Sequence, residues 1–462
     1  MSKPVLSAVA VSVLALAATA QEPSRPAAST PDATPTSATT PAHAEWTLDN
    51  GVTISTLWAP DAPLQHTITF LPHGLLDDGP GHTQRSHFVE HLILRHTDPD
   101  GLFGDGFELN GETTTRSIHL DTYAEPRAWR TTLERHATWL QPHEVTEAIL
   151  MQEQEAVAQE VLGLAAVGSS HKWADAAWVQ VVRFGAEHVD VVGDVRACTA
   201  REATTALAAI TGVRPGVHVA VVGPLPPNVV RAAVDEILGA VPALPRTEAS
   251  PEAGAELAPD PDAVRAPGAR RATWDLPSRH YVEWYPLPDR DVIDRAAGEV
   301  LAIRLNTRLA LDPDIRAAGV FAIAGADLVT PEGRFLRITV GLPGEVELEP
   351  VTRAIHAAVP DVLESGVGAA PLGMFLYQWA MNAVADPDPG AFRRERARTG
   401  PVDDRLEADF GISPMHKQLA SDLTREQRLE GLRGLDLERL QEIVDGFLTE
   451  ARRGSLLLTP RD

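Results

Sequence analysis

The sequence predicts an α+β protein of two similar halves, each a mostly antiparallel sheet packed with helices. A chain of 462 residues is too long for one compact core, so two or more domains are expected. A stretch rich in Pro, Ala and Glu at 246–272 indicates a linker near the middle. On both sides of it strands and helices follow in a similar order, and the second half closes with a helix, a glycine and a strand that resemble residues 202–222 of the first half. This similarity favours an old duplication, with halves at 45–245 and 273–462.

The elements of both halves follow from apolar periodicity and turn residues. Folded sequence is expected from about Trp46, and the dipeptide Asn50-Gly51 predicts a hairpin. In the first half we then expect strand His66–Leu71, helix Arg85–Thr97, strand Asn110–Thr115, helices Ala128–Leu140, Val145–Leu162 and Glu202–Gly212, strand Val217–Val222 and helix Val229–Val241. In the second half we expect strand His280–Trp284, helix Asp291–Leu311, strand Arg337–Val340, helix Leu435–Arg453 and strand Leu456–Leu458.

Charge and cysteine content exclude several classes of protein. The formal net charge of -24 argues against nucleic acid as a partner, because phosphates would be repelled. The single cysteine, Cys198, excludes an internal disulfide and a cysteine-based metal site. Any zinc would therefore depend on histidine and carboxylate ligands.

The N-terminal segment predicts export. Residues 1–20 contain a lysine, a short apolar run and Ala18-Thr19-Ala20 before Gln21, which is the pattern of a secretory signal peptide. Residues 21–44 are rich in Pro, Ala and Thr and are expected to form a disordered tether. No later segment is apolar and long enough for a membrane span. We therefore expect a secreted or periplasmic bacterial protein with no membrane span after cleavage.

The strongest motif is His87-x-x-Glu90-His91, the inverted form of the zinc-protease motif. On a helix, positions i and i+4 share a face, so both imidazoles can point at one ion. Glu90 falls beside that ion and is expected to act as general base for the attacking water. A histidine pair on an ordinary helix more often caps or packs than binds metal. Zinc usually takes a third protein ligand, which has to come from elsewhere in the chain.

The helix expected at Val145–Leu162 offers glutamates for that third position. Glu153 and Glu160 are seven residues apart and so lie on one helix face, whereas Glu155 points elsewhere. Glutamates on a helix are usually a solvated face. The missing ligand favours a metal-facing role here.

Taken together, these segments resemble the M16 metallopeptidases, the family of pitrilysin, insulin-degrading enzyme and the mitochondrial processing peptidase. The matching pieces are LDNGVTI, GLLDDGPG, HFVEHLILRHT, Asn110-x-x-Thr113, EQEAVAQE and VHVAVVGPLPPNVV. The resemblance implies the LuxS/MPP-like metallohydrolase fold in a half-length chain. It also implies Zn²⁺ on His87, His91 and Glu160, with Glu90 as general base and Glu153 in support. Asn110 and Thr113 match the strand edge along which the family lays its peptide substrate.

One departure from the family bears on partners. Arg316 matches a substrate-binding Arg of the family's second half, but no Tyr follows it, since the nearby positions are Phe321, Ala322 and Ile323. In half-length members this Arg and Tyr serve a partner chain's site. The resemblance therefore implies the catalytic member of a heterodimer whose second M16-like chain carries the pair, with a homodimer as the other arrangement. The rival interpretation is an inactive M16-like subunit that binds peptides or supports assembly.

Overall fold

The computed structural model describes residues 42–60, 62–97, 103–104, 107–166, 171–213, 216–243, 264–330, 333–364 and 425–461. These residues belong to one compact unit, Pro41–Asp462. The predicted signal peptide and residues 21–41 of the predicted tether lie outside the described residues. No helix in the described ranges has the length and apolar character needed to cross a bilayer.

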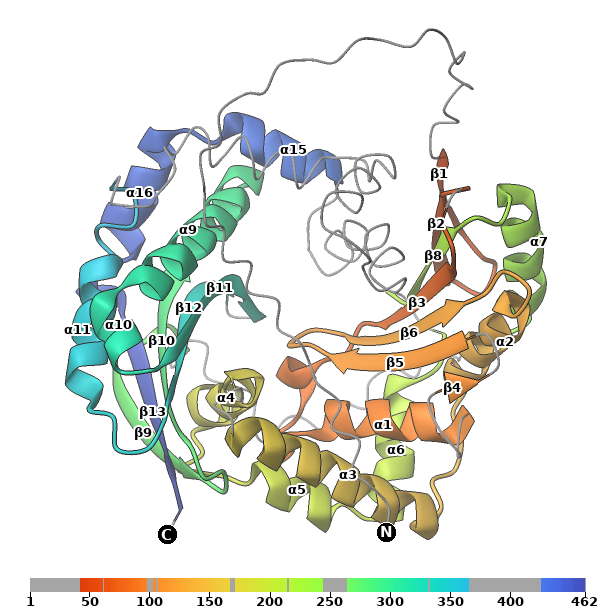
Figure 1. Ribbon diagram of the computed structural model, residues 1–462, viewed down its shortest axis with the longest axis horizontal. Coiled ribbons are helices and arrows are strands. Elements are labelled where there is room, and N and C mark those ends of the chain that lie inside the picture. The colour runs from red at the N-terminus through yellow and green to blue at the C-terminus, as the bar shows by residue number, and fades with distance from the viewer. Residues whose placement is uncertain are drawn as a thin grey trace, which may run out of the picture. The chain divides into compact units, whose positions relative to one another are not determined.

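The first sheet is built from the first half of the sequence and is mostly antiparallel (Figure 1). In spatial order its strands are β1 (Ala42–Thr47), β2 (Thr53–Trp58), β8 (His218–Gly223), β3 (Gln65–Leu71), β6 (Ile118–Ala124), β5 (Phe107–Thr113) and β4 (Phe103–Gly104). Only β2 and β8 pair in parallel. The predicted hairpin joins β1 to β2, and Gly51 turns the chain with a φ of 99°. Strand β1 begins inside the range predicted as tether, because backbone pairing with β2 orders a segment whose composition carries no strand pattern.

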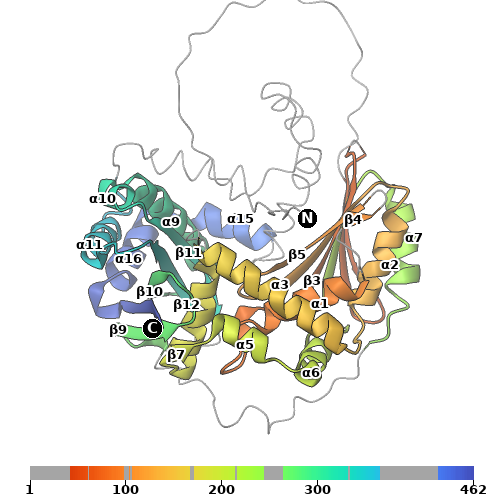
Figure 2. The same cartoon turned by 60° about the horizontal axis from the view of Figure 1, so that its bottom comes forward.

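The first half also forms helices, most of which lie on one face of this sheet, directly or packed on one another. They are α1 (Arg85–Thr97), α2 (Trp129–Trp139), α3 (Glu147–Ala166), α4 (His171–Trp178), α5 (Val191–Ala197), α6 (Ala200–Ile210) and α7 (Pro227–Ile237). A π-helical turn, Val179–Arg183, continues α4. Helix α1 packs against β5 and β6, and α3 runs beside α1 and α5, as Figure 2 also shows. The segment from α4 to α5 was not predicted from the sequence.

Five strands of the second sheet, read from its other end, repeat the order β2, β8, β3, β6 and β5 of the first. The strands of the second sheet are β11 (Phe321–Thr330), β12 (Gly333–Leu342), β10 (Arg279–Leu287), β13 (Gly454–Pro460), β9 (Gly268–Trp274) and β7 (His188–Val189). Strand β13 pairs in parallel with β9 and antiparallel with β10, as β8 does with β2 and β3. The predicted α+β fold of two similar, mostly antiparallel halves is therefore confirmed.

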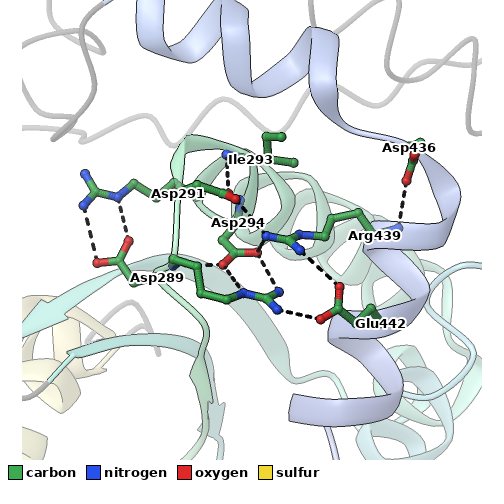
Figure 3. A network of polar contacts seen from close by, with 9 residues as sticks. Asp289, Asp291, Ile293, Asp294, Asp436, Arg439 and Glu442 are labelled. Carbon is green, nitrogen blue, oxygen red and sulfur yellow. Dashed lines mark hydrogen bonds and ion pairs between the residues drawn. The ribbon is translucent and has the colours of Figure 1, made fainter.

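Helices of the second half pack on one face of this sheet. They are α9 (Val292–Leu311), α10 (Pro313–Ala317), α11 (Leu348–Ala358), α15 (Arg425–Gly434) and α16 (Leu437–Phe447). The expected helix Leu435–Arg453 is shorter than predicted, since a separate 3-10 turn, Glu450–Arg452, follows α16. The buried carboxylate of Asp294 on α9 holds this layer together through ion pairs with Arg290 at 2.8 Å and Arg439 of α16 at 2.7 Å (Figure 3).

The two halves are less separate than the predicted boundaries imply. Strand β7 comes from the first half but pairs with β9 at the edge of the second sheet. Strand β9 itself begins at Gly268, inside the stretch predicted as linker, because parallel pairing with β13 orders it. The ring of Trp178 contacts that of Trp284, and Asp175 forms a buried ion pair with Arg337 of β12. The second sheet is therefore covered on one face by its own helices and contacted on the other by the first half.

Candidate metal centre

Helix α1 has a core face and a polar face. Val89, Leu92 and Ile93 are buried in the main hydrophobic core, which fixes the rotation of the helix. His87 and His91 lie one turn apart on the other side, with ring centroids 5.0 Å apart. The first turn is anchored where Ser86 donates from N and Oγ to Asp78 Oδ1, at 2.9 and 2.6 Å. Burial raises the pKa of Asp78 to about 8, although these hydrogen bonds oppose the rise.

The carboxylate of Glu160 on α3 reaches both histidines. Its Oε2 lies 3.6 Å from His87 Nε2 and 3.4 Å from His91 Nε2. These are the three side chains in the described parts of the chain that come together as a candidate metal site, with one donor atom from each within 4.8 Å of the others. Tetrahedral ligands at zinc bond lengths of about 2.0–2.1 Å lie about 3.3 Å apart, so the donor set fits Zn²⁺. The position that these three donor atoms face is called the shared point below. It is open to solvent, because the Glu160 side chain is 38% exposed.

Glu153 lies two turns before Glu160 and contacts His91 from the side opposite the shared point. Its Oε2 lies 3.2 Å from His91 Nδ1, and its Oε1 accepts from Arg95 Nε at 2.7 Å. The side chain is buried, and Val157 and Val161 on the same helix face pack into the core. Glu153 is placed to orient His91, and its contacts are those of a positioning residue rather than a catalytic one. Glu155, as predicted, points elsewhere and pairs with Arg196 at 3.4 Å.

Glu90 is held beside the shared point by strand β5. Thr113 Oγ1 donates to Glu90 Oε2 at 2.6 Å, and both side chains are buried. Gly111 makes room for this carboxylate, because a Cβ there would lie only 2.5 Å from Glu90 Oε1. Thr113 thus holds the predicted base with its hydroxyl, while substrate binding along this strand edge stays a prediction.

Sequence reasoning missed two neighbours of His87. Gln84 Oε1 lies 3.0 Å from His87 Nδ1, and the ring of Trp173 on α4 lies 5.0 Å from the imidazole at an interplanar angle of 35°. Gln84 is three residues before His87, a spacing that could have suggested the contact. Nothing in the sequence pairs Trp173 with the motif, because α4 reaches it only through the tertiary fold.

The two imidazoles have different electrostatic surroundings. Burial lowers the pKa of His87 below its usual value, although Glu160 opposes the shift. Burial also lowers the pKa of His91, but the carboxylates of Glu153 and Glu160 outweigh it and raise the pKa to about 10. The carboxylates around His91 therefore favour a positive charge at this position, which a divalent cation would supply.

The remaining predicted residues lie apart from this cluster. Asn110 is exposed on β5, on the opposite face of the strand from Thr113. From Leu109 to Thr113, the β5 edge away from β6 carries no other strand among the described residues. Arg316 is exposed on α10 in the second half, and no tyrosine stands among the residues that follow it into β11.

Comparison with known proteins identifies the fold. No protein-family model matches the sequence, and no curated protein matches it. A protease from Helicobacter pylori superimposes with a TM-score of 0.62 at 14% identity, covering 91% of this chain and 100% of its own. The periplasmic protease PqqL from Escherichia coli gives a TM-score of 0.56 at 15% identity, covering 96% of this chain and 49% of its own. A peptidase M16 inactive domain from Pseudomonas fluorescens gives a TM-score of 0.55 at 14% identity, covering 91% of this chain and 98% of its own. At such identities the likeness establishes a shared fold.

Proposed function

We propose that this chain, which has the fold of half-length M16-like peptidases, is a zinc-dependent endopeptidase. The observation that carries the proposal is the convergence of His87, His91 and Glu160 on one point, with Glu90 held beside it. The fold supports a protease in general, but the inactive relative shows that the fold alone does not imply catalysis. The assignment therefore rests on the side chains.

The residues divide the work of hydrolysis between them. Zinc bound by His87, His91 and Glu160 would supply Lewis acidity at the scissile carbonyl. Glu90 would take the proton from the attacking water and return it to the leaving amine. Because Thr113 donates to one carboxylate oxygen, the other oxygen of Glu90 is left for this proton. Glu153 keeps the ring of His91 in place.

The open edge of β5 supports an extended peptide as substrate. A peptide or unfolded segment could add to the backbone of Leu109–Thr113 as a further strand, which selects extended chains with little dependence on sequence. Asn110, exposed on this strand, is proposed to contact the substrate. Arg316 is proposed to bind substrate at a partner chain's site, because the matching Arg serves a partner's site in half-length members of the family.

The decisive experiment joins metal content with a substitution of the base. We expect about one zinc per chain by elemental analysis, lost with a chelator together with peptide cleavage. Glu90→Gln should keep the zinc and lower cleavage at least about 100-fold. Glu155→Gln is the matched control, because this glutamate lies on α3 but pairs with Arg196 away from the site. Zinc-free protein that still cleaves peptides would refute the proposal.

The second candidate is an inactive peptide-binding or assembly subunit, favoured by the missing Tyr and by the inactive relative. It predicts neither zinc nor cleavage, even when a second M16-like chain is present. The catalytic interpretation instead predicts that cleavage rises when a chain carrying the Arg and Tyr pair is added. Full activity of the purified protein as a homodimer would reject the heterodimer.

We also propose that the protein is exported to the bacterial periplasm or secreted, on the strength of its N-terminal residues. A mature N-terminus near Gln21 in the periplasmic or secreted fraction is the expected result. An uncleaved chain in the cytoplasm would contradict it.

A further inference from the structure

Gln84 is a buried amide in contact with a predicted metal ligand. Its Oε1 lies 3.0 Å from His87 Nδ1, and both side chains are almost fully buried, at 1% and 2% exposure. An amide oxygen can only accept, so the imidazole must carry its proton on Nδ1. The other ring nitrogen, Nε2, then has a free electron pair, and it is the atom that lies 3.6 Å from Glu160 Oε2.

We propose that Gln84 is a positioning residue that fixes the tautomer of His87 and so prepares Nε2 to bind metal. The proposal rests on the zinc site proposed above and adds a residue to it. With Gln84 in this role, the two histidines have the same hydrogen-bonding arrangement. The Nδ1 of each faces an acceptor, Gln84 or Glu153, and the Nε2 of each faces Glu160. Such outer partners orient the rings and raise the affinity of the site.

The orientation of the amide group decides the effect. If the amide were reversed, its NH₂ would face Nδ1 and favour the proton on Nε2, which could then not bind metal. Gln84 also lines a cavity of about 250 Å³ together with Arg85, Val195 and Ala203. Its Nε2 has no partner among the described residues, and a water molecule in this cavity could accept from it. A glutamate at this position would present an oxygen to Nδ1 in either orientation.

Two substitutions separate hydrogen bonding from packing. Gln84→Met keeps the length of the side chain but removes the acceptor, and Gln84→Glu keeps an acceptor. Gln65→Met is the matched control, because Gln65 is equally buried and accepts from Leu225 N far along the sheet from the site. Circular dichroism and urea unfolding should first show that each variant is folded.

The primary measurement is the zinc dissociation constant, obtained by competition with a chromogenic chelator. Gln84→Met should raise it about 10–100-fold. Gln84→Glu should match the wild type or bind more tightly, and Gln65→Met should leave the constant unchanged. In zinc-free protein, imidazole ¹⁵N resonances should show the Nδ1–H tautomer of His87 in the wild type and in Gln84→Glu, and a mixture in Gln84→Met.

The outcomes distinguish this inference from the proposed function. Wild-type protein that binds zinc, with an equal constant in Gln84→Met, would overturn the role of Gln84 and leave the zinc site standing. Gln84→Glu that binds as weakly as Gln84→Met would also overturn it, because an acceptor would then not be sufficient. If Gln84→Met fails to fold, the Gln84→Glu constant and the wild-type tautomer still decide. A wild-type protein without zinc affinity would overturn both proposals.

Discussion

Gly111→Ala should separate proton transfer from metal binding. A Cβ at this position would lie 2.5 Å from Glu90 Oε1 and 2.9 Å from its Cδ. Nonbonded contacts between such atoms lie near 3.5 Å, so the carboxylate or the strand must move by about 1 Å. Strand β5 is held by pairing with β6 and by the buried Leu109, and therefore the carboxylate should move and weaken its 2.6 Å hydrogen bond with Thr113.

A displacement of about 1 Å in a catalytic group can lower turnover about 100-fold. We expect Gly111→Ala to lower kcat on a fluorogenic peptide by about 10- to 100-fold while about one zinc per chain remains bound, because no ligand is touched. Gly163→Ala is the matched control, since a Cβ there meets nothing within 4 Å. The control should keep its activity and gain up to about 1 kcal/mol of stability from its helical position. A Gly111→Ala protein with wild-type turnover, or one that has lost its zinc, would refute this reasoning.

Three further predictions test other parts of the structure. Glu153→Met should weaken zinc binding about 10–100-fold in a chelator competition, because His91 Nδ1 loses its acceptor, and an unchanged constant would argue against that role. Burial lowers the pKa of His136 to about 3. The unfolded chain therefore takes up a proton at this residue below pH 6.5 that the folded chain does not, so the contribution of His136 to the free energy of unfolding should fall by up to about 1.4 kcal/mol per pH unit from pH 6.5 towards 3. In urea titrations His136→Gln should flatten this slope, and an identical slope would show that other groups cause it. Asp294→Ala should cost about 2–3 kcal/mol in urea unfolding, less than a fully buried broken pair, because the side chains of Arg290 and Arg439 are 45% and 22% exposed; an unchanged midpoint would contradict the role of this carboxylate.

Local periodicity was enough to predict much of the fold and which residues of the candidate site share a helix face. His87, Glu90 and His91 lie within one and a half turns of a helix, so their common face follows from helix geometry alone. The spacing of Glu153 and Glu160 likewise placed them on one face of α3. Which way that face points is a matter of packing, and the structure shows it turned towards α1.

Contacts between distant segments were decided only by the tertiary structure. Thr113 and Gly111 reach Glu90 because β5 pairs with β6 beside α1, and the sequence did not predict these contacts. Trp173 packs on His87 from a helix that the sequence did not predict. Strand β7 joins the second sheet although it belongs to the first half of the sequence.

The sequence by itself determined the order of the elements, the side of the metal helix that carries the chemistry and the candidate ligands. The tertiary structure decided which carboxylate reaches both histidines, what holds the predicted base and how the halves join. The physical reason is the separation along the sequence of the residues that interact. Helix and strand patterns repeat every few residues and are written into neighbouring positions, whereas side-chain contacts and strand pairing between distant segments depend on the packing of the whole core.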